Sequence, residues 1–467
     1  MSLASLHLRR SAVAVLATLL VVVARAGLAQ QNLPSDSAVH ALLHDRVESK
    51  RSSGIVVGMI DSAGRRRVSS YGLTGAAGSA PLDGNTVFEI GSITKVFTTA
   101  ILADMVARGE VSLDDPVAKY LPTSVKMPTR AGKQITLLDL ATQSSGLPRL
   151  PDNFHPKDQS NPYADYSVGQ MYEFLSGYAL TRDIGSAYEY SNLGMGLLGH
   201  ALALRAGTSY EALVTSRILE PLGMKDTRIT LTPAMKSRLA VGHDPAGAPV
   251  PNWDLPTLAG AGAIRSTVND MMLFLAANMD SARSPLSGQL ALAHLSRRPT
   301  GSPAITIGLA WHILRSPDGS QIITHNGQTA GYHGFLGYSP GRQVGVVMLA
   351  NSAADIDDMA LHLLDERLPL TPAPRAHTEI TLDSTLLQRF VGSYRFAPAF
   401  AIVVTRDGGR LFVQPTGQPK FPIFAESPTE FFLKAVDAQL SFVVEGGAVT
   451  GAVLHQAGQA LPGKREP

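Results

Sequence analysis

The segment EIGSITKVFTTA, residues 89–100, leads from an apolar run through a Gly-Ser pair into a sequence with helical character. If a helix begins near Ser92, residues three apart lie on one face, so the Lys95 amine can reach the Ser92 hydroxyl. A partly buried lysine with a lowered pKa can take the proton of a serine nucleophile, and N–H groups at a helix start favour an oxyanion. A Ser-x-x-Lys pair also arises by chance, as a helix cap beside a surface lysine, so the rest of the chain has to decide.

Length and composition favour a globular protein with two domains. The chain has 467 residues, of which 45% are hydrophobic and 17% are charged, and this is enough for a large core. Lysine plus arginine (40) against aspartate plus glutamate (38) leave a formal charge of +2, without a basic block interleaved with aromatics, so we expect no nucleic acid partner. There is no cysteine, which removes disulfides, cysteine-ligated zinc and thiol nucleophiles.

Residues 1–29 have the pattern of a cleavable signal peptide. A basic pair (9–10) precedes an apolar run (11–24), and the small residues Gly27 and Ala29 precede the expected cleavage site. A retained membrane anchor is the alternative, but the run is shorter than the roughly 20 residues of a spanning helix, and no later segment approaches a span. We therefore expect a periplasmic or secreted protein with no stable membrane span.

The order of helical and β-rich segments predicts an α+β fold. Two β-rich runs, 54–60 and 67–72, read as a hairpin, whereas the region from 114 to 278 is mostly helical. Further β-rich runs follow at 305–314, 321–324, 334–337 and 345–349. We predict one antiparallel sheet made from both ends of this region, with the helices inserted between its strands. Ser92 would then lie at the boundary between sheet and helices, where ligand clefts tend to form.

A helical pattern from Ser35 to Lys50 places His40 and His44 one turn apart. Two histidines at this spacing can bind a metal, but no glutamate follows His40 and no third ligand is evident. We interpret this segment as a surface helix and predict no metal site.

The C-terminal part reads as a separate small domain. A helical segment (356–367) is followed by a proline-rich stretch, and we place a linker at residues 371–379. Residues 380–467 alternate short strands with turns such as Asp407-Gly408-Gly409, which predicts a small antiparallel barrel or sandwich.

A second chemically suggestive stretch is Tyr190-Ser191-Asn192, just before a helical segment that begins at Leu193. A phenol near a lysine can carry a proton from the nucleophile to a leaving amine, and the Asn192 amide can orient a substrate carbonyl or Lys95. A purely structural alternative is that Ser191 or Asn192 caps the helix while Tyr190 packs.

The third stretch is His325-Asn326-Gly327-Gln328, at the end of a strand. A glycine at position 327 would allow a substrate backbone to approach closely. The N–H group of Gln328 would then be placed to act as a second oxyanion donor beside that of Ser92.

In this order and at these separations, Ser92-Ile93-Thr94-Lys95, Tyr190-Ser191-Asn192 and His325-Asn326-Gly327 resemble the three active-site motifs of the serine β-lactamase and penicillin-binding protein superfamily. The likeness is to the branch that holds class C β-lactamases, low-molecular-weight D-alanyl-D-alanine carboxypeptidases and related esterases. It covers about residues 40–365 and includes LATQSSGLP (140–148), EPLGMK (220–225) and GAGAIRSTVND (260–270). The resemblance implies a β-lactamase/transpeptidase-like serine hydrolase domain at 30–370, followed by a lipocalin-like barrel.

The resemblance also implies roles for individual residues. Ser92 would be the acylated nucleophile, with Lys95 and Tyr190 as the proton-transfer pair. The expected substrate-binding residues are Asn192, His325, Asn326, Gly327 and Gln328. The family's chemistry implies no cofactor and no metal.

The main departure from the class C pattern is His325, because class C β-lactamases usually have Lys-Thr-Gly at this motif whereas peptidases and esterases of the branch often have His-x-Gly. We therefore expect an exported hydrolase that acts on D-alanyl peptides of cell-wall type, with β-lactams as inhibitors or slow substrates. The alternatives are a class C-like β-lactamase, an esterase, and a non-catalytic receptor for muropeptides or penicillin. Loops such as residues 151–166 would set the choice of acyl donor, and both that choice and the oligomeric state stay open.

Overall fold

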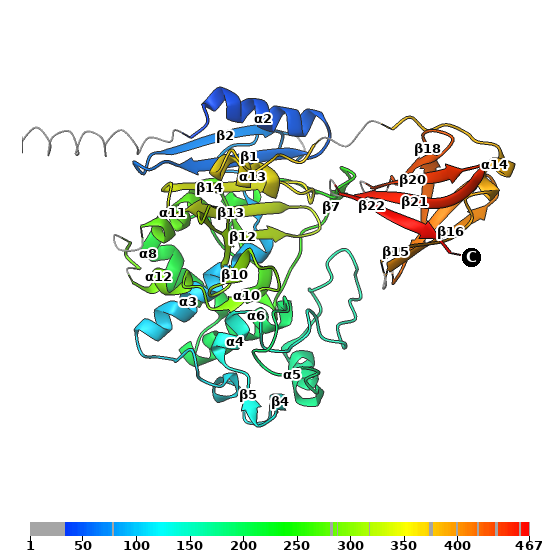
Figure 1. Ribbon diagram of the computed structural model, residues 1–467. Coiled ribbons are helices and arrows are strands. Elements are labelled where there is room, and N and C mark those ends of the chain that lie inside the picture. Colours follow the sequence, from blue (N-terminus) through cyan, green and yellow to red (C-terminus); the bar gives the residue numbers. More distant parts are fainter. Residues whose placement is uncertain are drawn as a thin grey trace, which may run out of the picture. The chain divides into compact units, whose positions relative to one another are not determined.

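The computed structural model describes residues 33–466, apart from 77–78, 281–283, 287, 317, 373–376, 398–399, 418–419, 435–437 and 457–458. The predicted signal peptide, residues 1–29, lies outside the described residues, as do positions 373–376 of the predicted linker. The chain divides between Leu370 and Thr371 into two compact units (Figure 1). Within the described residues, no helix is long and apolar enough to cross a membrane.

The first unit is built on an eight-stranded antiparallel sheet with the order β2-β1-β14-β13-β12-β11-β10-β9. Its strands are β1 (Gly54–Ile60), β2 (Arg66–Gly72), β9 (Arg298–Pro299), β10 (Ile305–Ile307), β11 (His312–Arg315), β12 (Gln321–Gln328), β13 (His333–Ser339) and β14 (Val344–Ala350). The N-terminal hairpin joins the C-terminal strands through β1 and β14, in a register that pairs Ile55 with Ala350. The predicted assembly of one sheet from both ends of the region is confirmed.

Strand composition follows position in this sheet. Strands β1, β13 and β14 are buried along their whole length, which fits the continuous apolar run GIVVGMI of β1 because both faces of the sheet are covered. Strand β2 lies at the edge and carries charged residues such as Arg66, and charge at an edge discourages pairing with another chain.

The helices lie on the two faces of the sheet. Helices α2 (Asp36–Glu48) and α13 (Asp357–Leu364) share one apolar cluster with β1 and β14, and Arg46 ties them together by an ion pair to Asp358 at 2.6 Å. The other face packs on the helical region that connects β2 to β9. Figure 1 shows α2 on one side of the sheet and α3 and α11 on the other.

The helical region contains α3 (Thr94–Ala107), α4 (Leu137–Ala141), α5 (Val168–Gly177), α6 (Asn192–Ala206), α7 (Tyr210–Val214), α8 (Glu220–Leu222), α9 (Pro233–Lys236), α10 (Ala259–Gly262), α11 (Val268–Met279) and α12 (Gln289–Ala293). It also contains the short turns η1 (Gly91–Ile93), η2 (Val117–Tyr120) and η3 (Thr215–Leu219), and the two-residue strands β3 (Phe88–Glu89), β4 (Thr129–Arg130), β5 (Lys133–Gln134), β6 (Gly242–His243), β7 (Pro249–Val250) and β8 (Arg265–Ser266). The expected α+β fold with an inserted helical region is therefore confirmed.

The structure refines the sequence prediction at three places. The β-rich run at 305–314 is two strands, β10 and β11, because the chain turns at residues 308–311 and Ala310 adopts a positive φ of 64°. The strand predicted at 321–324 continues to Gln328, so the whole third motif lies within β12. His40 and His44 lie on α2, where their rings pack against Tyr71 with centroids 5.6 and 4.8 Å away.

The second unit is a closed antiparallel barrel of eight strands, which decides between the predicted barrel and sandwich. Its strands are β15 (Gly392–Ala397), β16 (Phe400–Asp407), β17 (Arg410–Pro415), β18 (Phe421–Ala425), β19 (Glu430–Phe432), β20 (Ala438–Glu445), β21 (Ala448–Gln456) and β22 (Gln459–Arg465), preceded by α14 (Ser384–Gln388). Burial alternates along β16 and β20, as expected for strands with one face toward a core. That core includes Phe390, Tyr394, Phe431 and Phe442.

Candidate active site

Ser92 lies in the short turn η1, directly before α3, and this turn packs against β12 and β13 of the sheet. This turn is held by residue 264, because the Ile90 N–H donates to the Ile264 carbonyl (3.1 Å) and the Ile264 N–H donates to Thr94 Oγ1 (3.2 Å). Gly91 adopts a positive φ of 48° in the turn, a conformation that favours glycine. Ser92 is half-buried, so its hydroxyl is fixed in place and still accessible.

Lys95 is completely buried, and its Nζ lies 2.8 Å from Ser92 Oγ. The same Nζ donates to the Ala261 carbonyl in α10 at 2.7 Å. Burial, and then the positive charge of Arg149, lowers the pKa of Lys95 well below its ordinary value. A buried amine with a lowered pKa can be neutral near pH 7, and its lone pair can then accept the Ser92 proton.

Tyr190 lies in the loop before α6, and the residues on either side of it are fixed by Gln143. The Glu189 N–H donates to the Gln143 carbonyl (2.7 Å), and the Ser191 N–H donates to Gln143 Oε1 (2.8 Å). Lys95 Nζ lies 4.7 Å from the centre of the Tyr190 ring, whose hydroxyl interacts with the Ser92 side chain. Burial raises the pKa of Tyr190, so the side chain is a neutral phenol that can donate a proton.

The stretch around Tyr190 also has the capping role that the sequence left open. Ser191 is the N-cap of α6, with its Oγ accepting from the Gly194 N–H at 2.8 Å. Asn192, the first residue of α6, donates from Nδ2 to the Tyr163 hydroxyl at 3.2 Å, while its buried Oδ1 has no hydrogen-bond partner. Capping by Ser191 and exposure of the Tyr190 and Asn192 side chains to the site are therefore compatible.

Glycines allow β12 to lie directly against the Ser92 turn. A Cβ atom added to Gly327 would lie 2.1 Å from the Ile90 carbonyl oxygen and 2.9 Å from the Ser92 nitrogen. A Cβ atom on Gly91 would lie 2.8 Å from the Gln328 nitrogen. The backbone amides of Ser92 and Gln328 thus belong to two segments in close contact, which is the arrangement that an oxyanion site needs.

His325 lies on the same face of β12 as Gly327 but is almost fully buried, with 1% exposure. Its Nδ1 donates to the Asn326 carbonyl at 2.5 Å, and its ring lies 5.4 Å from that of His312. Burial, then the nearby His312 and Lys95, lowers the pKa of His325 well below its ordinary value. His325 is therefore a neutral hydrogen-bonding group at neutral pH.

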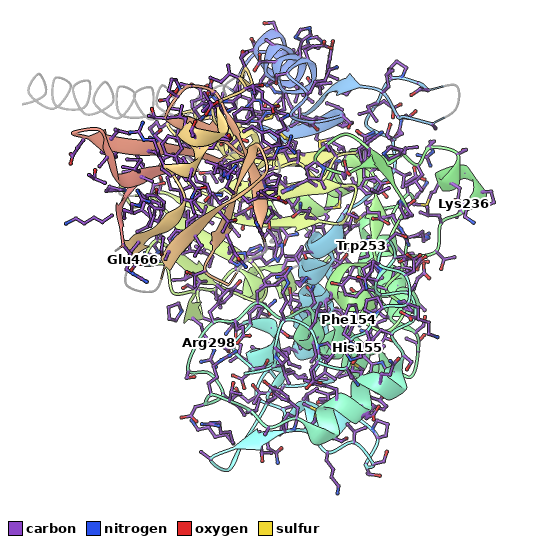
Figure 2. All side chains as sticks on the ribbon, turned by 90° about the vertical axis from the view of Figure 1, so that its right-hand side faces the viewer. Phe154, His155, Lys236, Trp253, Arg298 and Glu466 are labelled. Atoms are coloured by element: carbon purple, nitrogen blue, oxygen red, sulfur yellow. The ribbon has the colours of Figure 1, made fainter. Side chains whose placement is uncertain are left out.

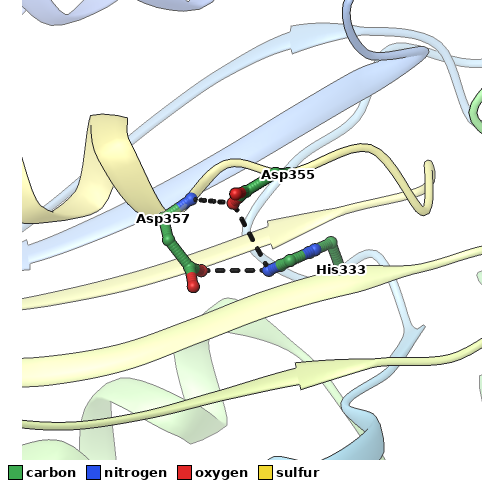
Figure 3. A group of neighbouring side chains, drawn as sticks. All are labelled: His333, Asp355 and Asp357. Carbon is green, nitrogen blue, oxygen red and sulfur yellow. Dashed lines mark hydrogen bonds and ion pairs between the residues drawn. The ribbon is translucent and has the colours of Figure 1, made fainter. Parts of the chain in front are cut away.

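Asn326 departs from its predicted place in the substrate site. Residues alternate between the faces of a strand, so Asn326 points away from the face that carries Gly327, and its Nδ2 donates to Asp357 Oδ2 at 2.5 Å. Asp357 also accepts from His333 Nε2 (2.9 Å), beside Asp355 (Figure 3). The Gln328 side chain likewise donates away from the nucleophile, to the Ala353 carbonyl at 2.7 Å, which leaves its backbone as the part that lies near Ser92.

The sequence profile of the family described as Beta-lactamase matches residues 39–368, which contain all three motifs and the whole of the sheet. The chain belongs to the β-lactamase family. A second profile, described as a domain of unknown function (DUF3471), matches residues 376–465, the region of the barrel.

Relatives of this β-lactamase-family chain include a β-lactamase, a carboxypeptidase/endopeptidase and a penicillin-binding protein. A β-lactamase of Pseudomonas fluorescens is 28% identical over 350 residues, covering 68% of this chain and 92% of the relative. The D-alanyl-D-alanine-carboxypeptidase/endopeptidase AmpH of Escherichia coli K12 is 30% identical over 350 residues, covering 69% and 88%. Penicillin-binding protein 4* of Bacillus subtilis is 26% identical over 417 residues, covering 83% and 90%.

A solved structure supports the same family and fold. The class C β-lactamase from Rhodobacter sphaeroides superposes with a TM-score of 0.61 at 27% sequence identity, covering 71% of this chain and 99% of that one. The predicted likeness to the class C and carboxypeptidase branch is thus confirmed.

The site of this family member includes aromatic residues that the motifs do not reveal. Phe154, Tyr163 and Trp253 form a continuous cluster, with Tyr163 5.1 Å from Phe154 and 5.4 Å from Trp253 between ring centres; Figure 2 labels Phe154 and Trp253. Because Tyr163 accepts a hydrogen bond from Asn192, this cluster reaches the Tyr190-Ser191-Asn192 motif. Phe154 and Tyr163 come from the loop at 151–166, which the sequence analysis named as a pocket wall without identifying these residues.

Three further residues, Tyr188, His312 and Arg149, were not identified from the sequence. The Tyr188 hydroxyl forms a 3.0 Å hydrogen bond with His312 Nε2, and the His312 ring in turn packs against His325. Arg149 places its guanidinium carbon 5.1 Å from the centre of the Tyr190 ring. A signal for Arg149 was present, because it directly follows the LATQSSGLP stretch at 140–148.

Proposed function

We propose that this chain is an exported serine hydrolase that forms an acyl-enzyme at Ser92 with D-alanyl peptides of cell-wall type. The observation that carries the proposal is the 2.8 Å contact between Ser92 Oγ and the buried Lys95 Nζ, with the Tyr190 phenol beside both. β-Lactams, which acylate the same nucleophile, act as inhibitors or slow substrates. Relatives named as a carboxypeptidase/endopeptidase and as a penicillin-binding protein support this choice.

In the acylation step, Ser92 Oγ attacks the carbonyl carbon of the penultimate D-alanine and Lys95 takes the hydroxyl proton. The hydrogen bond that Lys95 donates to the Ala261 carbonyl holds the amine so that its lone pair can face Ser92. The backbone amides of Ser92 and Gln328 stabilise the negative oxygen of the tetrahedral intermediate.

Breakdown of the intermediate breaks the peptide C–N bond and releases the terminal D-alanine. Its amine receives a proton from Tyr190, which is reprotonated by Lys95, so that no net charge is left in the buried pocket. A water molecule then attacks the ester carbonyl of the acyl-enzyme by the reverse proton path, which releases the shortened peptide and restores Ser92. Asn192 orients the acyl carbonyl through its amide.

His325 favours the peptidase over a β-lactamase. The support is the resemblance, because peptidases and esterases of the branch often have His-x-Gly at this motif where class C β-lactamases have Lys-Thr-Gly. Burial keeps His325 neutral, so this position offers no permanent cation to a substrate carboxylate, whether of a β-lactam or of a peptide. An esterase of the same family is the second candidate, favoured by the aromatic cluster of Phe154, Tyr163 and Trp253, which suits an uncharged apolar acyl group.

Export is part of the proposal because cell-wall peptides lie outside the cytoplasm. It rests on the signal-peptide pattern at residues 1–29. N-terminal sequencing of the protein recovered from a periplasmic or culture fraction tests it, with a new N-terminus close to Gln30 as the expected result.

The catalytic proposal is tested with Ser92→Ala. We expect this variant to lose covalent labelling by a fluorescent penicillin while keeping its fold, and Ser62→Ala, at an exposed serine in the hairpin turn, to label normally. Lys95→Ala and Tyr190→Phe should each slow acylation by about 10²- to 10⁴-fold. Undiminished labelling of Ser92→Ala would overturn the assignment.

Among a D-Ala-D-Ala peptide, nitrocefin and a nitrophenyl ester, the peptide should be hydrolysed with the highest kcat/KM by the unmodified protein.

A further inference from the structure

Arg149 is anchored next to the catalytic tyrosine. Its carbonyl oxygen accepts from the N–H groups of Asn192 (3.0 Å) and Leu193 (3.2 Å), the first residues of α6. Pro148, which precedes it, accepts from Ser191 Oγ at 2.6 Å. These bonds fix the backbone of Arg149 against the Tyr190-Ser191-Asn192 motif.

The Arg149 side chain is exposed and extends over the Tyr190 ring. In the part of the chain that the structure describes, no carboxylate forms an ion pair with its guanidinium. Other arginines of the first unit are paired: Arg182 with Glu189 and Arg298 with Asp139. Arg149 therefore offers a fork of donors at the mouth of the site, and this geometry matches a carboxylate.

The charge of Arg149 reaches the reacting groups. After the larger effect of burial, it lowers the pKa of Lys95, and it opposes the burial-driven rise in the pKa of Tyr163 and of Tyr190. An anionic substrate group in this region would be attracted by the same positive charge that disfavours protonation of Lys95.

The other basic side chains near Ser92 are poorly suited to this task. Lys95 is buried and is held between Ser92 and Ala261, and His325 is neutral. Arginine keeps its charge at any accessible pH. Arg149 can therefore supply the charge that the third motif lacks.

We propose that Arg149 binds a carboxylate of the acyl donor and makes the enzyme selective for anionic substrates. The inference rests on the proposed function, since it assumes acylation of Ser92. Two sources of the carboxylate share this chemistry. One is the terminal carboxylate of the leaving group, one carbon from the atom that Tyr190 protonates, and the other is an acidic group on the acyl side, near Asn192.

The test uses four depsipeptide donors that differ only in charge. Each has a D-alanyl ester as the scissile bond, with either a succinamoyl or a succinyl group on the acyl side and either D-lactate or D-lactamide as the leaving group. The kcat/KM values are measured for the full chain, for Arg149→Gln and for Arg149→Lys. Arg66→Gln serves as a matched control, because Arg66 is an exposed arginine on the edge strand β2.

The ratio of each charged donor to its uncharged partner isolates the carboxylate contact, because any effect of Arg149 on the Lys95 proton acts on both donors. We expect Arg149→Gln to lower one ratio by about 10- to 100-fold, and Arg149→Lys and Arg66→Gln to change it far less. If the ratio falls for the D-lactate and D-lactamide pair, Arg149 binds the carboxylate of the leaving group. If it falls for the succinyl donor and its uncharged partner, Arg149 binds the carboxylate on the acyl side.

Ratios unchanged in both pairs would overturn the role of Arg149, even where Arg149→Gln slows all donors equally. Arg149→Met, which keeps an apolar stem over Tyr190, should give the same ratios as Arg149→Gln and replaces it should that variant misfold. Failure of the underlying function looks different, since Ser92→Ala would then keep its turnover or the unmodified chain would hydrolyse none of the donors.

Discussion

At the scale of single residues, the position of Ser92 depends on glycines as much as on its polar neighbours. Gly327 has backbone contacts on the side where a methyl group would project, with the Ile90 oxygen at 2.1 Å from the ideal Cβ position. The backbone at Gly327 and the backbone at Ile90 are each fixed by other hydrogen bonds. Neither segment can therefore move far without shifting Ser92 relative to β12.

We predict that Gly327→Ala lowers the rate of penicillin labelling by about 100-fold or more, since an ångström of misplacement has that effect on catalysis, and lowers the free energy of unfolding by about 1–3 kcal/mol. Labelling kinetics and urea denaturation measure the two effects. Gly341→Ala, where the added Cβ would meet nothing within 4 Å, should leave both unchanged. Normal labelling of Gly327→Ala would mean that β12 does not support the oxyanion site.

Two asparagines of the motifs should behave differently. Asn192 has a free buried Oδ1 at the site, whereas Asn326 is bonded to Asp357 on the other face of β12. Asn192→Ala should therefore lower kcat/KM for peptide donors by about 10-fold or more, through loss of a hydrogen bond to the substrate. Asn326→Ala should leave kcat/KM unchanged and cost only stability. Equal losses of activity in the two variants would contradict this assignment of faces.

At the scale of elements, the cluster of His333, Asp355 and Asp357 fastens β13 to the start of α13. The His333 side chain is buried, with 7% exposure, and donates to Asp357 at 2.9 Å. Burial acts to lower the pKa of His333, but the hydrogen bond and charge of Asp357, with Asp355 nearby, outweigh it and raise the pKa. The charged pair therefore stabilises the fold fully below the unfolded pKa of about 6.5, and this stabilisation is lost as the pH rises through the raised folded pKa.

We predict that Asp357→Asn lowers the free energy of unfolding by about 1.5–3 kcal/mol at pH 5.5, because it leaves a buried imidazolium without its charged acceptor. The loss should be smaller at pH 9, where His333 is neutral. Urea denaturation at both values measures the difference. Asn326→Ala removes the other contact to Asp357 and should cost the same at both pH values. Equal destabilisation by Asp357→Asn at pH 5.5 and pH 9 would show that His333 does not titrate in the folded state.

The elements show how far sequence reasoning extends. The spacing of Ser92 and Lys95, three residues apart at a helix start, predicts a contact that the structure places at 2.8 Å. Strand alternation also assigns Asn326 to the face opposite Gly327, and it was the motif alone that suggested otherwise. The inserted helical region follows from the change of period between residues 72 and 305.

Other parts of the site depend on contacts between segments far apart in the chain. Ala261, which holds the Lys95 amine, is separated from it by 166 residues, and Tyr163 reaches Asn192 from an irregular loop. The burial that lowers the pKa of Lys95 and of His325 is likewise a property of the packed fold. Local periodicity carries no information on such contacts, so neither the lowered pKa of His325 nor the packing of the Arg149 side chain on the Tyr190 ring could be predicted.

At the scale of the whole molecule, each of the two units has its own core. The first has apolar clusters on both faces of its sheet, and the second has a cluster of side chains inside the barrel. A closed barrel leaves no unpaired edge along its strands. The division between Leu370 and Thr371 therefore separates two segments of the chain, each of which can bury an apolar core of its own.

We predict that a chain ending at Leu370 folds, and that the fluorescent penicillin labels it at the rate of the full chain, because the Ser92, Lys95 and Tyr190 side chains and their supports all come from the first unit.

A chain starting at Thr371 should fold as a monomer with a β-type circular dichroism spectrum. Its closure rests on the pairs Tyr394–Arg465 and Arg395–Lys464 between β15 and β22, with Glu466 accepting from Arg395 at 2.5 Å. A matched barrel that ends at Gly463 loses both pairs and exposes two strand edges, so it should aggregate or unfold at lower temperature. Size-exclusion chromatography and thermal melts compare the two barrels, and labelling kinetics compare the catalytic unit with the full chain. An insoluble or unlabelled first unit would show instead that the barrel is required for the fold or the site.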